Sequence, residues 1–229
     1  MILLARPQRH ARRQAQGIIG VSPVFPIPRI NARLAPAGRR PDSTTIKAFD
    51  FLWRREYSGM TYSAFINEFL REAQLPRLSA QEPLPDRRLI QRVEAAKDDE
   101  IAAAGGQEAM CSRSLLLMAA GDLDQAHRIV QAMSTSEGAY IHGLIHRIDD
   151  DFDNARYWFR RAGAQSATTE MYRRASVVSA TVASRSNWDP FLVTDMLETS
   201  RNTGVTEELR TILTIEFEEL LVGCRGVAA

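Results

Sequence analysis

Apolar residues along most of this chain recur every three or four positions, which is the spacing of amphipathic helices. No window alternates apolar and polar residues at period two with β-branched side chains, so the pattern predicts no β-sheet. The expected fold is all-α, with about 8–10 helices. They are predicted to form one body, which we expect to extend from residue 42 to residue 229.

Capping residues and helix breakers place the expected helices along this body. Three prolines indicate a surface linker over residues 75–85, Gly105 and Gly106 end one helix, and Asp189 with Pro190 begins another. The expected helices cover residues 42–57, 61 to about 74, 86–104, 107–120, 122–133, 137–149, 151–163 and 166–184, a segment that starts at 189, and 206–222.

The helix pair over residues 137–163 carries most of the chemically interesting side chains. His142, His146 and Asp149 form a polar stripe on its first helix, with small residues beside them. Small residues let a neighbouring helix approach closely, so we expect both histidines to be partly buried. On the second helix, a polar line contains Asn154, Tyr157 and Arg161, and Trp158 flanks it.

The same pair resembles a tetratricopeptide repeat, because Gly143, Ala155, Phe159 and Ala162 match the small and aromatic packing positions of that helix–turn–helix unit. A weaker copy lies upstream, where residues 121–126 parallel residues 150–155 at an offset of 29. The resemblance implies a right-handed, tetratricopeptide-like array of antiparallel helix hairpins. Its core would span residues 107–165.

A second resemblance rests on three strings of residues. The first is His-x-x-x-His-Arg followed by Asp-x-Ala-x-Tyr-Trp-Phe-Arg-Arg over residues 142–161, and the others are Trp-Asp-Pro-Phe at 188–191 and Glu-Phe-Glu at 216–218. Over residues 107–222, the chain resembles an uncharacterised family of small, all-helical, tetratricopeptide-like proteins. That family has Glu-Gly-Asp where this chain has three aspartates at 149–151. The resemblance supports the fold and the site residues and implies no particular reaction.

The charge of the chain divides at residue 41. Residues 1–41 contain eight arginines and no Asp, Glu or Lys, so the remainder holds 29 − 8 = 21 basic and 28 acidic residues, a net charge of −7. An acidic body argues against a nucleic-acid platform. The basic, proline-rich arm over residues 1–41 is interpreted as a mitochondrial transit peptide, a disordered tail or an extension of the start site.

Compartment and membrane topology follow from composition. No apolar run approaches the roughly 20 residues that a membrane span needs. The two cysteines, Cys111 and Cys224, form no disulfide framework and have no metal-ligand spacing. We therefore expect a protein of the cytoplasm or the mitochondrial matrix that is not secreted.

Three interpretations of the polar cluster stay open. In the first, His142 and His146 are hydrogen-bonded core histidines, and Asn154, Tyr157 and Arg161 form a solvated or helix-locking face. In the second, which we adopt, the face binds a small anionic ligand or a protein or peptide partner. The residues expected to bind are His142, His146, Arg147, Asn154, Tyr157, Trp158, Arg161 and Glu216.

The third interpretation is a small helical enzyme that uses His142 and His146. Together with Asp149, they could ligate a divalent metal, and Glu216 would be a further ligand. The glutamate that follows the first histidine in zinc proteases is replaced by Gly143, so that type of hydrolysis is unsupported. Metal-free acid–base chemistry, with Arg161 holding an anion, is the other form of this interpretation.

Glu216 is singled out because it interrupts an apolar helical stripe. Such a carboxylate either lies at the margin of the stripe, where it reaches water, or is buried with a partner. If it is buried, we expect that partner to be a histidine or an arginine of the central hairpin.

Overall fold

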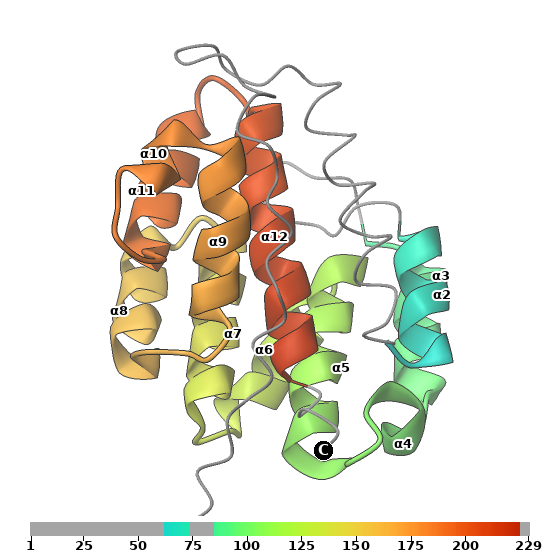
Figure 1. Cartoon of the computed structure of the whole chain (residues 1–229). Coiled ribbons are helices and arrows are strands. Elements are labelled where there is room, and N and C mark those ends of the chain that lie inside the picture. The colour runs from blue at the N-terminus through green and yellow to red at the C-terminus, as the bar shows by residue number, and fades with distance from the viewer. Residues whose placement is uncertain (1–61, 74–84, 225–229) are drawn as a thin grey trace, which may run out of the picture. The chain divides into compact units, whose positions relative to one another are not determined.

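The computed structural model describes residues 62–73 and 85–224, and all the regular elements of these residues are helices (Figure 1). The eleven helices described there are α2 (Ala64–Glu72), α3 (Arg87–Ala95), α4 (Asp98–Ile101), α5 (Gly106–Ala120), α6 (Leu123–Gln131), α7 (Ser136–Ile148), α8 (Phe152–Ala162), α9 (Thr168–Val178), α10 (Ala180–Ala183), α11 (Pro190–Ser200) and α12 (Glu207–Gly223). The all-α prediction is confirmed. The expected helix over residues 42–57, the arm over residues 1–41 and nearly all of the linker lie outside the described residues.

Short polar side chains begin the helices where the sequence predicts. The side chains of Asp86, Asp122, Asp151, Asp189 and Thr206 each accept a hydrogen bond from a backbone N–H of the helix that follows. One expected cap is wrong: Ser63 caps α2 in place of Thr61, with its hydroxyl accepting from the N–H of Ile66.

Two helices that the sequence predicts as continuous are interrupted. The segment over 86–104 leaves the helical conformation at Ala96 (ψ 139°) and resumes as the four-residue α4. The segment over 166–184 breaks at Ser179 (φ −134°, ψ 117°), whose side chain then caps α10. These breaks explain why the described residues contain more helices than expected.

Helices that are neighbours in the sequence pack in pairs. α5 packs against α6, α7 against α8 and α9 against α10, while α6 also contacts α7. The C-terminal helix α12 returns along the earlier helices and contacts α5, α9 and α11, and Figure 1 shows it beside α9. Among the described residues, no helix is both long and apolar enough to cross a membrane.

The two cysteines lie where α12 meets α5. Cys111 of α5 and Cys224, which ends α12, are both buried free thiols. A hydrogen bond to Cys111 and burial raise the pKa of the Cys224 thiol well above its ordinary value. Both cysteines are buried in the core and form no disulfide.

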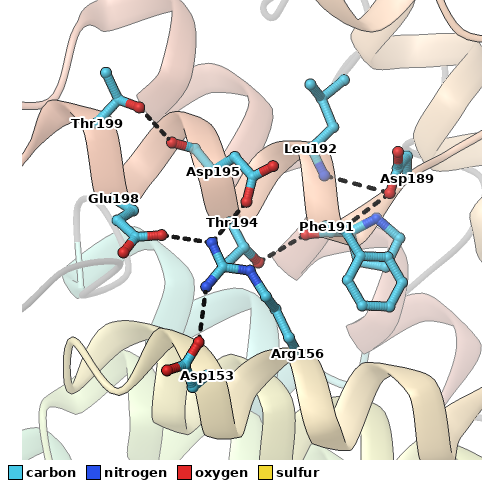
Figure 2. A network of polar contacts seen from close by, with 10 residues as sticks. Asp153, Arg156, Asp189, Phe191, Leu192, Thr194, Asp195, Glu198 and Thr199 are labelled. Carbon is cyan, nitrogen blue, oxygen red and sulfur yellow. Dashed lines mark hydrogen bonds and ion pairs between the residues drawn. The ribbon is translucent and has the colours of Figure 1, made fainter.

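Arg156 links α8 to α11 (Figure 2). Its guanidinium donates to Asp195 Oδ1 at 2.6 Å and to Glu198 on α11, and it also reaches Asp153 on its own helix at 3.4 Å. The two carboxylates of α11 raise the pKa of Arg156, which therefore stays charged. This bridge holds the second helix of the central pair against the C-terminal part of the chain.

The turns within the α5–α6 and α7–α8 pairs share one geometry. Gly121 (φ 93°) and Asp150 (φ 64°) both adopt the left-handed conformation. The residue after each donates its N–H five residues back, from Asp122 to Leu117 and from Asp151 to His146, at 2.9 Å in both cases. Asp150 takes the position that Gly121 has in the first turn, and aspartate is one of the few residues other than glycine that tolerate this conformation.

The left-handed turn predicts a difference between two substitutions of Asp150. Both Asp150→Gly and Asp150→Ala remove the ion pair with Arg201 (3.2 Å), so their comparison isolates the backbone. We expect the Gly variant to be more stable than the Ala variant by about 1 kcal/mol, because a positive φ is unfavourable for Ala and costs Gly nothing. Urea unfolding measures the difference. Equal stabilities would contradict the assigned turn.

Candidate functional site

Three histidines meet where α6 packs against α7. His127 Nε2 and His142 Nε2 are 2.8 Å apart, and the rings of His127 and His146 have centroids 5.2 Å apart. His142 and His146, one helical turn apart on α7, lie nearly parallel, with an interplanar angle of 14° and a centroid distance of 4.9 Å. A set of ring nitrogens, one from each histidine, lies within 4.8 Å of one another.

Side chains of α8 cover this cluster. The indole of Trp158 stacks on the imidazole of His142, with centroids 3.7 Å apart and an interplanar angle of 16°. Asn154 places its amide nitrogen 3.2 Å and 3.3 Å from the two ring nitrogens of His146. The carboxylate of Asp151, the N-cap of α8, lies 3.6 Å from His146 Nδ1. The α7–α8 turn therefore supplies the polar surroundings of His146.

Burial keeps the imidazoles on α7 neutral at pH 7. It lowers the pKa of His142 to about 4, and the neighbouring His127 and His146 contribute to the same effect. The pKa of His146 is also lowered, first by burial and then by His127, while the charges of Asp151 and Asp149 oppose the shift. His142 is the buried member, whereas His127 and His146 each remain partly exposed.

Two of the residues predicted to bind lie in a different place. Arg147 and Glu216 are almost completely buried (3% and 1% exposed side chain) and form an ion pair between α7 and α12. Tyr140 donates its hydroxyl proton to Glu216 Oε1 at 2.7 Å and accepts from Trp188 Nε1 at 2.8 Å. Glu216 is therefore buried with a partner, and the partner is an arginine of the central hairpin.

This buried network has the properties of a structural element. Burial and the charge of Glu216 raise the pKa of Tyr140 well above its ordinary value, so the phenol keeps its proton. The guanidinium of Arg147 also lies over the ring of Phe159, with 5.4 Å between its carbon and the ring centroid. Because this network lies in the core, Arg147 and Glu216 are not part of the face that carries the histidines.

Asp149 is also separate from the three-histidine group. It lines a surface hollow of about 580 Å³ beside Pro85, Glu94, Asp122 and Asp124. Its influence on His146 is electrostatic, through the pKa described above. The carboxylate that the spacing on α7 suggested as a metal ligand thus lies beside the cluster, outside the set of converging ring nitrogens.

Two of the three residues in the polar line of α8 are exposed, and Asn154 is partly buried. Tyr157 is 49% exposed, and Arg161 is exposed one turn later, whereas Phe152 and Phe159 on the same helix are buried. Tyr157 meets Trp158 edge to face at 5.4 Å, and the Arg161 guanidinium lies 5.6 Å from the Trp158 ring centroid.

His127 was not identified from the sequence. The sequence feature that could have pointed to His127 is the grouping of histidines along the chain. The chain has four histidines, and three of them, His127, His142 and His146, fall within 20 residues. His127 also follows Ala126, the buried small residue that aligns with Ala155 in the weak repeat. Helical spacing relates residues of one helix only, so it could not show that α6 would present this side chain to α7.

Comparison with known proteins adds no assignment to this geometry. No protein-family model matches the chain, and no curated protein or solved structure matches it either. The arrangement itself offers the ring nitrogens of three histidines at one point and, beside them, the aromatic and cationic surface of Tyr157, Trp158 and Arg161. Neutral imidazoles can coordinate a metal or exchange protons, and the surface can bind an anion.

Proposed function

We propose that this chain is an α-helical ligand-binding domain whose binding surface consists of Tyr157, Trp158 and Arg161 on α8, together with the adjoining histidines. The ligand class is an anion that carries carboxylate or phosphate groups, either as a small molecule or as an acidic segment of a protein. The proposal treats the α5–α6 and α7–α8 pairs as two tetratricopeptide-like hairpins, a unit that serves mostly as a binding scaffold.

The observation that carries the proposal is the position of Trp158. Its indole contacts His142, Tyr157 and Arg161, so one side chain connects the buried histidines with the exposed surface. An exposed tyrosine and a partly buried tryptophan beside an arginine are typical of binding surfaces, since they provide contact area at low entropic cost.

The packing of α12 supports this choice of surface. Helical repeats commonly bind ligands on the concave face that their first helices line. Here α12 contacts α5 and α9, and Glu216 of α12 pairs with Arg147 of α7. Since the chain's own C-terminal helix covers that side, the remaining candidate is the side of α6 and α8, where His127 and Trp158 lie.

The charges on α8 favour an anion. Within residues 62–73 and 85–224, neither Arg160 nor Arg161 forms an ion pair, and both side chains are exposed. A guanidinium that is not engaged in an ion pair can bind a carboxylate or a phosphate through two parallel hydrogen bonds. The edge of Tyr157 and the ring of Trp158 supply apolar contact beside it.

Calorimetric titration with inorganic phosphate, citrate and an oligoglutamate peptide tests the proposal and separates a small ligand from an acidic segment. We expect at least one probe to bind, and Tyr157→Ala and Arg161→Ala each to weaken its binding by about tenfold or more, because each removes a side chain that would contact the ligand directly. The free energy of unfolding should change by less than about 1 kcal/mol, since both side chains are exposed.

Matched controls come from other helices. Val177→Ala removes the other large exposed apolar side chain of the described residues, on α9, and Arg87→Ala removes an exposed arginine on α3. Both should leave binding unchanged. Failure of all three probes to bind, or a loss of several kcal/mol of stability in Tyr157→Ala or Arg161→Ala, would contradict the proposal.

A further inference from the structure

We propose that His127, His142 and His146 form a binding site for one divalent transition-metal ion of the zinc class. This inference concerns the three histidines alone, and metal binding can be tested separately from anion binding by Tyr157, Trp158 and Arg161. It extends the metal interpretation of the sequence by replacing Asp149 and Glu216 with a third histidine from α6.

The distances fit a shared ion after small movements. Zinc–nitrogen bonds of about 2.0–2.1 Å in tetrahedral geometry separate the ligand nitrogens by about 3.3 Å. His127 Nε2 and His142 Nε2 are 2.8 Å apart, and the nitrogens of all three residues lie within 4.8 Å. The nitrogens that are farthest apart therefore have to approach each other by up to about 1.5 Å to surround a metal.

Ring orientation identifies the residue that must move. A metal lies in the plane of each imidazole that binds it, yet His142 and His146 are nearly parallel. Trp158 holds His142 by stacking, whereas the side chain of His146 is 16% exposed and can rotate about its Cβ–Cγ bond. His127 already meets His142 at an interplanar angle of 88°, as two ligands of one ion can.

The surroundings of His146 match those of a metal ligand. Metal-binding histidines usually donate their second ring N–H to a carboxylate or carbonyl, which fixes the tautomer and raises ligand basicity. Asp151 Oδ2 lies 3.6 Å from His146 Nδ1, just beyond hydrogen-bond distance, and a small rotation of the ring would let Nδ1–H donate to this carboxylate, which leaves Nε2 for the ion. The charges of Asp149 and Asp151 also offset part of the charge of a divalent cation.

The cluster differs from a set of ordinary core histidines in its hydrogen bonding. Buried polar groups are nearly always satisfied. His142 Nδ1 is buried and makes no hydrogen bond within the part of the chain that the structure describes. Within the same residues, the ring of His142 makes a single hydrogen bond, from Nε2 to His127. Since the Nε2 atoms of His127 and His142 face each other at 2.8 Å, an ion that both nitrogens bind would replace this contact between two imidazoles.

The donor set decides the class of metal. Three imidazole ligands suit zinc, copper, nickel or iron, whereas magnesium and calcium require oxygen ligands, which the converging set does not contain. Three protein ligands leave at least one coordination position for water or for an oxygen of a bound anion, as in catalytic zinc sites.

Direct binding measurements test the site. The full chain, prepared without a polyhistidine tag and stripped with a chelator, is titrated with Zn²⁺ in a calorimeter and with Co²⁺ by visible absorption. We expect one equivalent to bind, with a cobalt spectrum characteristic of nitrogen ligands in tetrahedral or five-coordinate geometry. His127→Ala and His146→Ala should each weaken zinc binding by more than about 100-fold, since losing a residue that merely orients a ligand already costs about 10–100-fold.

The fourth histidine of the chain supplies the control. His10→Ala should bind zinc as the unmodified chain does. His127 and His146 are partly exposed, so their variants should fold, which circular dichroism verifies, whereas His142→Ala alone would be ambiguous because that side chain is buried. Absence of stoichiometric zinc binding, or affinity unchanged in His127→Ala and His146→Ala, would overturn the proposal.

Discussion

Glu216→Ala is expected to lower the free energy of unfolding by about 3–5 kcal/mol, because it breaks a buried ion pair by removing one partner. Loss of the carboxylate leaves the guanidinium of Arg147 charged in the core, where 3% of its side chain is exposed. It also deprives the Tyr140 hydroxyl of the acceptor 2.7 Å away. Guanidinium chloride unfolding followed by circular dichroism measures the loss.

Two further variants distinguish a buried charge from a general loss of contacts. The double variant Arg147→Met, Glu216→Leu removes both charges and retains apolar volume, so it should be more stable than either single variant. Glu198→Ala removes a carboxylate that is 45% exposed and pairs with Arg156, and it should cost no more than about 1 kcal/mol. A Glu216→Ala protein as stable as Glu198→Ala would show that Arg147 does not depend on this partner.

Gly143→Ala should destabilise the protein by about 1–3 kcal/mol, although replacing glycine by alanine inside a helix ordinarily stabilises by about 0.5–1 kcal/mol. A Cβ at this position would lie 2.7 Å from Phe159 Cε1 and 2.8 Å from Cδ1. The ring of Phe159 cannot move aside freely, because Tyr140, Phe191 and the Arg147 guanidinium surround it. The sign of the change therefore tests the close approach of α7 and α8.

A double-mutant cycle isolates that contact. Phe159→Leu should cost stability by itself, because a buried ring is lost, but Gly143→Ala should be less harmful in its presence than in the unmodified chain. Thermal unfolding of the four proteins gives the coupling energy. A stabilising Gly143→Ala would mean that α7 and α8 are further apart than the structure places them.

Local sequence determined the helices and most of their ends, because the interactions that decide them act within a few residues. The capping carboxylates of Asp122, Asp151 and Asp189 bind N–H groups two or three residues ahead, so the starts of α6, α8 and α11 were predictable. The exposure of Tyr157 and the burial of Phe159 likewise followed from helical periodicity. The breaks at Ala96 and Ser179 were not predicted, since neither residue is a strong helix breaker.

Only the tertiary structure decided which side chains meet. Periodicity places His142 and Arg147 on different faces of α7, but nothing local to α7 shows that the first faces α6 and α8 and the second faces α12. The partners of these two residues, His127 and Glu216, lie 15 and 69 residues away and are brought near by helix packing. Periodicity assigns a residue to a face of its own helix, but which helix covers that face depends on how all the apolar faces are buried together. The sequence by itself therefore determined the helices and the polar stripe of α7, while the packing of α6 brought His127 to that stripe and the packing of α12 paired Arg147 with Glu216 in the core.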